Sequence, residues 1–453
     1  MAERILFGTD GVRGVANVYP MTSEIVMALG RAIAVAFPCS KGRTRILIGK
    51  DTRLSGYTFE TALATGACSM GADVILVGPV PTPGVAYLTG SMRANAGVVI
   101  SASHNSFEDN GLKFFGGDGY KLPDKVEARI EELALNPSQL PALAVGSNFG
   151  RATRIEDPSG RYCVYLKSQF PKHLSLDGLR VAIDCANGAG YRVGPMVFDE
   201  LGADVVAIGD SPDGTNINEN CGALHPEALG RTVVERRCDI GIALDGDGDR
   251  LILTDENGYV VDGDGVLAIC SAYMVEHGKL KGGGIVGTVM SNYGLEVMLK
   301  KQGLVLERAD VGDRYVVEKM IAGGYNVGGE QSGHLLFLDH ATTGDGLISA
   351  LKVLEVMLTT GKRLSELAKI FERYPQVLIS KKVREKLPIE DLQHTSSTIN
   401  RVESQLAGKG RVNVRYSGTS ALLRVMVEGE DEGKVRSYAE QIIAAAREDD
   451  LLA

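Results

Sequence analysis

Two segments of the sequence show the same order of predicted elements, and this repeat restricts the fold more than any other feature. The first begins with RILIGKDTRLSG at Arg45 and ends with GADVILVG at Gly78, and the second begins with RVAIDCANGAG at Arg180 and ends with LGADVVAIG at Gly209. Each predicts a strand, a polar turn, a helix and a second strand, which is the pattern of a βαβ unit with parallel strands. Any two such units look alike, but the shared Gly-Ala-Asp-Val favours a common origin.

The rest of the chain extends this pattern and then departs from it. GGIVGTVMSNYGLEVMLKKQG, from Gly283, predicts a third copy, whereas from Val377 onward the sequence predicts a strand, a helix, the strands RVNVRYSG and LLRVMVEG, and a helix over Glu430 to Glu448. Leu135 to Gly150 carries proline and glycine with weak periodicity, so we interpret it as a linker or an irregular segment. The sequence therefore predicts three similar α/β domains with mixed sheets and a smaller C-terminal α+β domain.

Composition and charge narrow the class of function. The net charge of −9 and the pI near 5.5 argue against a general binder of nucleic acid or anionic membranes, although a local basic pocket for a phosphorylated small molecule is compatible with them. The N-terminal residues lack the apolar region of a signal peptide, and no apolar run reaches the roughly 18 residues of a membrane helix. Seven scattered cysteines without a C-x-x-C pair disfavour zinc and disulfide frameworks, so we expect a cytoplasmic protein.

The segment GIALDGDGDRLILTD, from Gly241 to Asp255, is the strongest candidate metal site. Asp245, Asp247 and Asp249 alternate with glycines, and alternate residues of an extended segment point the same way. Three carboxylates that converge in this way repel one another unless a cation lies among them. Hard oxygen ligands favour magnesium or calcium.

Three other interpretations of this segment are weaker. A calcium-binding EF-hand loop requires glycine at its sixth position, which is Arg250 here, and helices where this sequence predicts strands. A D-x-D-x-T phosphatase nucleophile requires threonine where Asp249 stands. An acidic surface turn remains as an interpretation without a function. The guanidinium of Arg250 suits a phosphate oxygen that a metal also touches.

Two further polar loops suggest sugar and phosphate binding. VGGEQSGH, from Val327 to His334, offers a carboxylate, an amide and hydroxyls that suit sugar hydroxyls, or a turn that merely caps structure. RYSGTSALLR, from Arg415 to Arg424, has the guanidinium, hydroxyls and glycine of a phosphate cradle, or of an ordinary hairpin turn.

In VVISASHNSFEDNG, residues 98–111, an apolar strand ends in hydroxyl, imidazole and amide groups. A Ser–His hydrolase dyad is disfavoured, because there is no G-x-S-x-G motif and the adjacent Ser103 and His104 side chains should diverge on an extended backbone. The alternative is that Ser103 carries a phosphoryl group, which brings about two negative charges and three acceptor oxygens. One of these oxygens could complete the metal site of the three aspartates, so the two motifs explain each other.

The motifs TDGVRG, SASHN, DGDGDR, GEQSGH and R-x-S-G-T occur here in the order found in the α-D-phosphohexomutases, and the chain resembles that superfamily from Gly8 to about Gly429. Their surroundings, such as VVISASHNSFEDNGLKFF, TVMSNYGLE and VGDRYV, are most similar to the glucosamine-phosphate branch. The resemblance implies a heart-shaped enzyme of four domains around a central cleft. We expect the domains at 1–155 with the phosphoserine loop, 156–255 with the metal-binding loop, 256–372 with the sugar-binding loop and 373–453 with the phosphate-binding loop.

The resemblance also implies roles for individual residues. The expected catalytic residues are Ser103, His104, Lys113, Arg13 and His334. The expected substrate-binding residues are Arg250, Glu330, Ser332, Arg415, Ser417, Gly418, Thr419 and Arg424. The expected ligands of one Mg²⁺ per active site are Ser103, in its phosphorylated form, Asp245, Asp247 and Asp249. Arg13 and Lys113 alone would more often be solvated charges, but beside a phosphoryl group they can neutralise developing charge.

The implied activity interconverts glucosamine 6-phosphate and glucosamine 1-phosphate through a 1,6-bisphosphate, as a step toward UDP-N-acetylglucosamine. Glucosamine 1,6-bisphosphate or a kinase would supply the first phosphoryl group on Ser103, and Lys113, His104 and His334 are all candidates for the general base. Glucose or mannose phosphates are the alternative substrates, and a non-catalytic sugar-phosphate binder is the alternative from another class. The expected partner is a small hexose phosphate, with no nucleic acid and no membrane, and the expected assembly is a monomer or homodimer.

Two loops depart from the common pattern of the superfamily. The phosphate loop has Tyr416, Ser420 and Ala421 where R-P-S-G-T-E-P is common, and Ser106 replaces the proline that usually follows SASHN. Loss of proline leaves a loop less restricted. The lost glutamate adjoins the phosphate anchor, so phosphate affinity and substrate choice are where a difference from the superfamily is expected.

Overall fold

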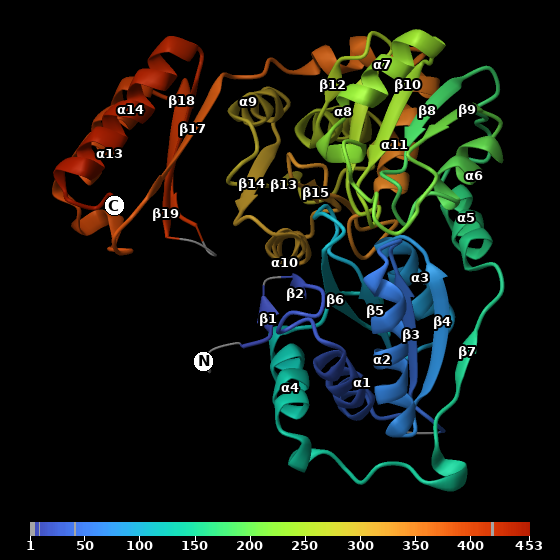
Figure 1. The fold of residues 1–453 in the computed structure, drawn as a ribbon. Helices are drawn as coiled ribbons and strands as arrows, with labels where there is room; N and C mark the ends of the chain where they lie inside the picture. Colours follow the sequence, from blue (N-terminus) through green and yellow to red (C-terminus); the bar gives the residue numbers. More distant parts are fainter. Residues whose placement is uncertain (1–4, 9, 40–41, 418–420) are drawn as a thin grey trace.

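The computed structural model describes residues 5–8, 10–39, 42–417 and 421–453. Within these residues the chain forms four β-sheets in succession, each with its own helices, and we call the four parts units 1 to 4. Figure 1 shows units 1 to 3 against one another and unit 4, in red, to one side, joined to them by an extended segment. The predicted fold class, three α/β parts with mixed sheets and a smaller C-terminal α+β part, is confirmed.

Unit 1 is built on a sheet of seven strands in the order β1-β2-β6-β5-β3-β4-β7. The strands β3, β4, β5 and β7 are parallel, and β6, β2 and β1 continue the sheet in antiparallel pairs. The strands are β1 (Phe7–Gly8), β2 (Gly11–Val15), β3 (Arg45–Lys50), β4 (Asp73–Pro79), β5 (Ala96–Ile100), β6 (Asp109–Gly116) and β7 (Ala152–Arg154). The helices are α1 (Ser23–Ala36), α2 (Ser55–Ser69), α3 (Thr82–Ser91) and α4 (Asp124–Leu135), with short 3₁₀ turns η1 (Pro137–Gln139) and η2 (Gly146–Asn148).

Unit 2 has a sheet of five strands in the order β12-β11-β10-β8-β9, in which β8, β9 and β10 are parallel. Its strands are β8 (Arg180–Asp184), β9 (Asp204–Ile208), β10 (Ile240–Leu244), β11 (Leu251–Asp255) and β12 (Val260–Val261). Its helices are α5 (Pro158–Ser168), α6 (Val193–Asp199), η3 (Gly222–Leu224) and α7 (Glu227–Arg236).

Units 3 and 4 have smaller sheets, in the orders β14-β13-β15-β16 and β17-β19-β18. Unit 3 contains α8 (Gly263–Glu276), β13 (Gly284–Thr288), α9 (Tyr293–Lys301), β14 (Val305–Ala309), α10 (Asp313–Gly323), β15 (Val327–Gly329), β16 (Leu335–Phe337), α11 (Gly346–Thr360), α12 (Leu364–Leu367) and η4 (Ala368–Ile370). Unit 4 contains β17 (Gln376–Lys382), η5 (Ile389–Asp391), α13 (Gln393–Leu406), β18 (Gly410–Tyr416), β19 (Leu422–Gly429) and α14 (Glu432–Glu448).

The predicted repeat is present in the sheets. Arg45 pairs with Asp73 in the parallel strands β3 and β4, and Arg180 pairs with Asp204 in β8 and β9. In both units the first residue of the repeat therefore lies opposite the aspartate of Gly-Ala-Asp-Val. The third copy is also a βαβ unit, formed by β13, α9 and β14. The predicted linker between Leu135 and Gly150 follows the end of α4 and is mostly exposed. The residue bounds of the four predicted domains stay a prediction.

The apolar cores show which units are joined. Units 2 and 3 share one cluster of buried side chains, which includes Ile183 and Leu253 from unit 2 and Ile269 and Leu351 from unit 3. Units 1 and 4 each have a core of their own. Units 2 and 3 therefore form one packed body. None of the helices in the described ranges is both long and apolar enough to cross a membrane.

We predict that Leu351→Ala lowers the unfolding free energy by about 3 kcal/mol, because it opens a cavity in the shared core. Leu351 is fully buried in α11. Calorimetric unfolding should show a lower transition temperature. The control Leu378→Ala removes a side chain that is 47% exposed and should leave the transition within about 0.5 kcal/mol of the wild type. Equal effects of the two substitutions would contradict the shared core.

Candidate active site

Three loops that follow strand ends meet where units 1, 2 and 3 touch. The loop after β5 carries Ser103, the loop after β10 carries the three aspartates, and the loop after β15 carries Glu330 and His334. The second and third loops are joined by a β-bridge between Arg250 and His334 and by the amide of Leu251, which donates to the carbonyl of Gly333 over 2.9 Å. Loops at the carboxyl ends of strands are the usual place for a site in α/β folds.

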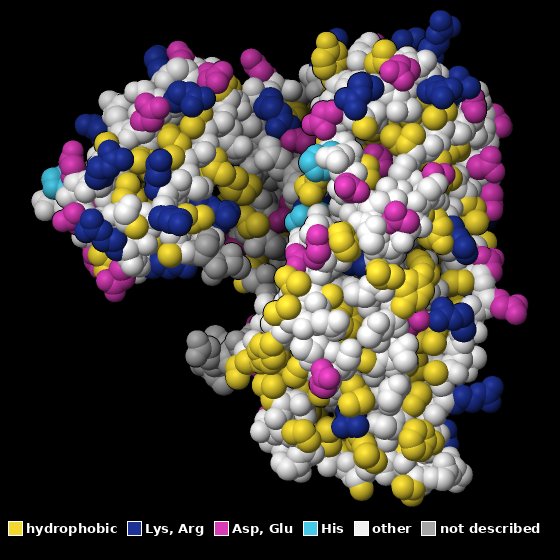
Figure 2. Space-filling model, in the orientation of Figure 1, with side chains coloured by type: hydrophobic (Ala, Val, Ile, Leu, Met, Phe, Trp, Pro, Cys, Tyr) yellow, Lys and Arg dark blue, Asp and Glu magenta, His cyan; other side chains and the backbone are white. Residues whose placement is uncertain are grey.

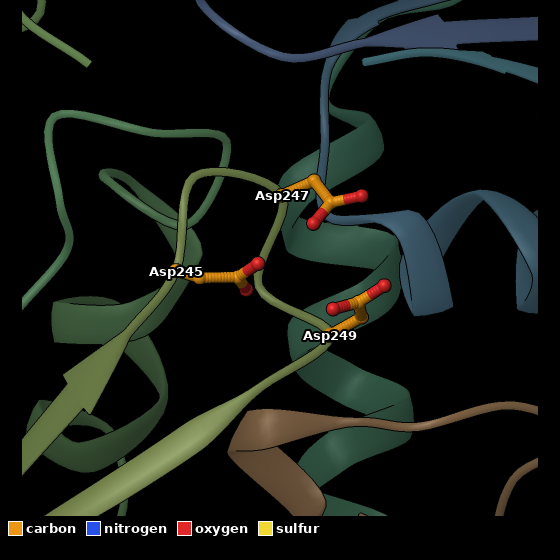
Figure 3. Close-up of side chains that lie close together, drawn as sticks. All are labelled: Asp245, Asp247 and Asp249. Atoms are coloured by element: carbon orange, nitrogen blue, oxygen red, sulfur yellow. The ribbon is translucent and has the colours of Figure 1, made fainter. Parts of the chain in front are cut away.

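Asp245, Asp247 and Asp249 converge as predicted. All three are buried, and one carboxylate oxygen from each lies within 4.8 Å of the others. Figure 3 shows their carboxylates turned toward one space within the loop between β10 and β11. The loop turns at Gly248, whose φ of +70° is a conformation that favours glycine.

The triad holds buried oxygens that lack a hydrogen bond within the described residues. Asp247 Oδ2 accepts from both Thr82 Oγ1, at 2.6 Å, and Lys113 Nζ, at 2.7 Å, but Asp247 Oδ1 has no such partner. Asp249 Oδ1 is likewise without a hydrogen bond. Burial, followed by the charges of Asp249 and Asp247, raises the pKa of Asp245 to about 8. Buried carboxylate oxygens that lack a donor fit a hard divalent cation such as Mg²⁺.

Ser103 lies against this triad. Its side chain is buried, and its Oγ donates to Asp245 Oδ2 over 2.6 Å. The expectation that Ser103 and His104 diverge is wrong, because Ser103 has a φ of +53° rather than an extended backbone, and its Oγ lies 3.4 Å from His104 Nδ1. Burial, with the charges of Arg250 and Arg13, lowers the pKa of His104 to about 4.

Lys113 reaches the same site from β6, where it pairs with Val99 of β5. Its Nζ lies 2.7 Å from Asp247 Oδ2, 2.9 Å from Asp249 Oδ2 and 3.6 Å from Asp10 Oδ2. Burial opposes the charge of Lys113, but these three carboxylates outweigh it and hold its pKa well above the usual value.

His334 lies between two aspartates of different units. Its Nδ1 is 3.5 Å from Asp249 Oδ1, and its Nε2 is 3.5 Å from Asp313 Oδ2. Burial lowers the pKa of His334, but Asp249 and Asp313 outweigh it and the net shift is upward. Arg250 lies at the edge of the triad, with its amide donating to Asp245 Oδ1 over 3.1 Å and its Nε 4.0 Å from Asp249 Oδ1.

Sequence reasoning missed a chain of charges that links these groups. Asp10 pairs with Arg13, Lys113 and Lys121, and Lys121 also pairs with Asp313 at 2.5 Å. Asp10 and Asp313 stand in the quoted segments TDGVRG and VGDRYV without an assigned role, and Lys121 carries no signal of its own. These ion pairs place Arg13 near Lys113, because both side chains contact Asp10.

The predicted sugar loop lies beside these residues. Glu330 is mostly buried, and its Oε1 accepts from the amide of Gly312 over 3.0 Å, while Ser332 is exposed. The amide of Glu330 donates to the carbonyl of His334, which closes a tight turn. The loop therefore presents the exposed hydroxyl of Ser332 close to the carboxylate of Glu330, whose position is fixed by a hydrogen bond.

The predicted phosphate residues belong to unit 4. Arg415 and Arg424 are opposite each other in β18 and β19, and burial together with the charge of Arg424 lowers the pKa of Arg415. Ser417 is buried, and its carbonyl accepts from Lys386, which sequence reasoning did not select. Gly418 and Thr419 lie outside the described residues. Two adjacent guanidiniums suit an anion such as a phosphate.

The structure thus gathers most of the predicted residues at one place, whereas the predicted phosphate residues lie in unit 4, which contacts unit 3 where Arg411 donates to the carbonyl of Ser291 over 2.9 Å. Ser103, the triad, Lys113, His104, His334 and Arg250 are connected by the contacts above. Figure 2 shows a notch between unit 4 and unit 1.

Comparisons with known proteins agree with this arrangement. Four family descriptions, "Phosphoglucomutase/phosphomannomutase" alpha/beta/alpha domains I, II and III and C-terminal domain, match residues 4–140, 161–258, 262–374 and 359–445. The "Phosphoglucosamine mutase" of Geobacter sp. (strain M21) is 58% identical over 437 residues, which is 96% of each chain.

Solved structures show the same fold at lower identity. A phosphoglucomutase/phosphomannomutase family protein of Burkholderia thailandensis has a TM-score of 0.80 at 20% identity, over 98% of each chain. The N-acetylphosphoglucosamine mutase of Aspergillus fumigatus, in complex with GlcNAc-6P and magnesium, has a TM-score of 0.67 at 17% identity, over 99% of this chain and 96% of that one.

We predict that Asp247→Asn weakens binding of Mn²⁺, used as a probe for Mg²⁺, by about 10-fold or more, because it removes a charge and an oxygen ligand. Isothermal titration calorimetry measures the affinity and the number of ions per chain. Asp210→Asn, an exposed residue of the same unit, is the control and should bind like the wild type. Undiminished binding by the Asp247 variant would refute the metal site.

Proposed function

The chain belongs to the phosphoglucomutase/phosphomannomutase family, and from that premise we propose that it interconverts glucosamine 6-phosphate and glucosamine 1-phosphate. It is an intramolecular phosphotransferase, a mutase of the isomerase class. The observation that carries the proposal is the buried Oγ of Ser103, 2.6 Å from the carboxylate of Asp245 in a triad that suits a cation. A phosphoryl group on this oxygen would lie at the triad.

Asp245, Asp247, Asp249 and the phosphorylated Ser103 would hold one Mg²⁺. The buried oxygens Asp247 Oδ1 and Asp249 Oδ1, which accept no hydrogen bond within the described residues, support this assignment. When bound, the ion would neutralise negative charge on the phosphoryl group that is transferred. Lys113 and Arg250 would add positive charge from the protein itself, since both lie against the triad.

In the first half-reaction, the O1 hydroxyl of glucosamine 6-phosphate attacks the phosphorus of phosphoserine 103. The bond from phosphorus to Ser103 Oγ breaks as the bond to O1 forms, which gives glucosamine 1,6-bisphosphate. The proton of O1 is lost and the serine oxygen gains one, so no net acid or base is produced. Lys113, His104 and His334 are candidates to handle this proton, since each lies close to Ser103 or to the triad.

In the second half-reaction, the bisphosphate turns round and the 6-phosphoryl group returns to Ser103. The O6–phosphorus bond breaks, the serine ester re-forms and glucosamine 1-phosphate is left. Because both ends of the sugar must visit Ser103 in turn, the phosphate that is not reacting needs a separate anchor. Arg415, Ser417 and Arg424, with Gly418 and Thr419 of the same loop, would supply it from unit 4.

The sugar ring would lie between these two ends. Glu330 and Ser332 would bind its hydroxyls, with His334 and Arg13 near the transferring group. The first phosphoryl group on Ser103 would come from glucosamine 1,6-bisphosphate or a kinase. A cytoplasmic location and a monomer or homodimer stay predictions, as does the absence of nucleic-acid and membrane partners.

We predict that Ser103→Ala reduces mutase turnover to background, because the variant lacks the oxygen that carries the phosphoryl group. A coupled assay for glucosamine 1-phosphate measures it. Ser106→Ala, an exposed serine of the same loop, should keep turnover within a few fold of the wild type. Full activity in the Ser103 variant would refute the carrier role.

We also predict that incubation with a hexose 1,6-bisphosphate adds a mass of about 80 Da, a single phosphoryl group, to Ser103. Intact-mass spectrometry with peptide mapping measures it. In the same preparation, kcat/KM for glucosamine 6-phosphate should exceed that for glucose 6-phosphate and mannose 6-phosphate. A preference for either of the latter two would replace the proposed substrate, and no phosphoserine at all would favour a sugar-phosphate binder without catalysis.

A further inference from the structure

The backbone of Ser103 is held on both sides by buried groups, and three of them, Asp51, Arg53 and Asn218, lie outside the motifs of the active site. Its φ of +53° is a conformation that non-glycine residues adopt only when their surroundings enforce it. This conformation directs Oγ toward Asp245. The groups that enforce this backbone conformation therefore also determine where Ser103 carries the phosphoryl group.

The amide side of Ser103 is fixed through Ser101 and Asp51. The amide of Ser103 donates to Ser101 Oγ over 2.9 Å, and this hydroxyl donates to Asp51 Oδ2 over 2.6 Å. Both Ser101 and Asp51 are completely buried. The hydroxyl of Ser101 is thus used as both acceptor and donor, which leaves it no freedom to rotate.

The carbonyl side of Ser103 is fixed by Arg53. Arg53 is completely buried and paired with Asp51, with its Nε 2.8 Å from Asp51 Oδ2. Its Nη2 donates to the carbonyls of Ser103, at 2.9 Å, and Asn105, at 2.8 Å. Its Nη1 donates to the carbonyl of Asp109 at 3.0 Å and to that of Ser106.

A buried ion pair is weak evidence for stability, because desolvation of both charges offsets their attraction. In this pair, Arg53 also donates from Nη1 and Nη2 to four backbone carbonyls between residues 103 and 109. The planar guanidinium can serve four carbonyls in fixed directions, which an ammonium cannot do. This geometry indicates a role in shaping the loop.

Unit 2 holds the same two carbonyls from the other side. Asn218 Nδ2 donates to the carbonyls of Ser103 and Asn105, both at 2.9 Å. Asn218 itself is 9% exposed. It belongs to a loop that contacts unit 1 again where the amide of Leu54 donates to the carbonyl of Gly214 over 2.9 Å. Unit 2, which carries the aspartate triad, thus also forms hydrogen bonds with the loop that carries Ser103.

We propose that Arg53 and Asn218 are positioning residues for phosphoryl transfer, which set Ser103 Oγ against the triad by clamping the carbonyls of Ser103 and Asn105 between units 1 and 2. This inference rests on the proposed carrier role of Ser103. The clamp acts on the carrier through its backbone and touches neither the sugar nor its phosphate. Its loss lowers the rate of transfer and leaves substrate binding nearly unchanged.

The test measures the rate constant of a single turnover, in which full-length protein with a radiolabelled phosphoryl group on Ser103 is mixed with excess unlabelled glucosamine 6-phosphate and loss of the label from Ser103 is followed. A rate constant does not depend on how much of the protein is folded, so a purely structural defect would not change it. The variants are Asn218→Ala, Asn218→Asp and Arg53→Lys. Asp keeps the shape of Asn and tolerates a positive φ, but presents an acceptor to the two carbonyls.

Asn220→Ala is the matched control. Asn220 lies two residues further in the same loop, is exposed, and has a φ of +54° against +59° for Asn218. Asn220→Ala therefore places alanine at a similarly positive φ, as Asn218→Ala does, but keeps the hydrogen bonds to the carbonyls of Ser103 and Asn105.

We expect the single-turnover rate constant to fall about 10-fold in Asn218→Ala, further in Asn218→Asp, and about 100-fold in Arg53→Lys, with KM within about 3-fold of the wild type. Asn220→Ala should transfer at the wild-type rate. If both Asn218 variants transfer as fast as Asn220→Ala, the clamp is refuted, even where Arg53→Lys does not fold. If the wild type forms no phosphoserine at residue 103, the proposed function fails instead.

Discussion

Mutual repulsion among three buried carboxylates is the constraint on which the rest of the structure depends. Asp245, Asp247 and Asp249 are placed within one short loop, and the protein offsets their charge with Lys113 from unit 1, Arg250 from unit 2 and His334 from unit 3. Because two of these three counter-charges come from other units, assembly of units 1, 2 and 3 stabilises the loop in this form. The buried carboxylate oxygens that still accept no hydrogen bond within the described residues make the site suited to a cation and, with it, a phosphoryl group.

Features that follow from local pattern could be predicted from the sequence. The alternation of aspartate and glycine predicted the triad, and the repeat of strand, turn and helix predicted the parallel pairs that start at Arg45 and Arg180. These succeed because side-chain direction in a strand and the handedness of a crossover depend on a few neighbouring residues. Ser103 was predicted from the chemistry of its neighbours, and its contact with Asp245 is consistent with that reasoning.

Contacts between distant residues could not be predicted. Lys121 contacts Asp10 across 111 positions, and Asn218 contacts the carbonyl of Ser103 across 115. Periodicity carries no information about such pairs, since they depend on how whole sheets are placed. The left-handed backbone of Ser103 is a further example: serine has no propensity for it, and the network around Arg53 that enforces it is invisible until the chain is folded. For this reason the expected divergence of Ser103 and His104 was wrong.

The separate core of unit 4 has a consequence for how such a chain can vary over evolutionary time. A substitution among residues 376–453 repacks a small module and leaves the shared core of units 2 and 3 untouched. The residues that would bind the non-reacting phosphate of a substrate can therefore change in sequence, while the site of phosphoryl transfer is held constant by charges from three units. Tyr416, Ser420 and Ala421, where this chain departs from the common loop, fall within residues 376–453.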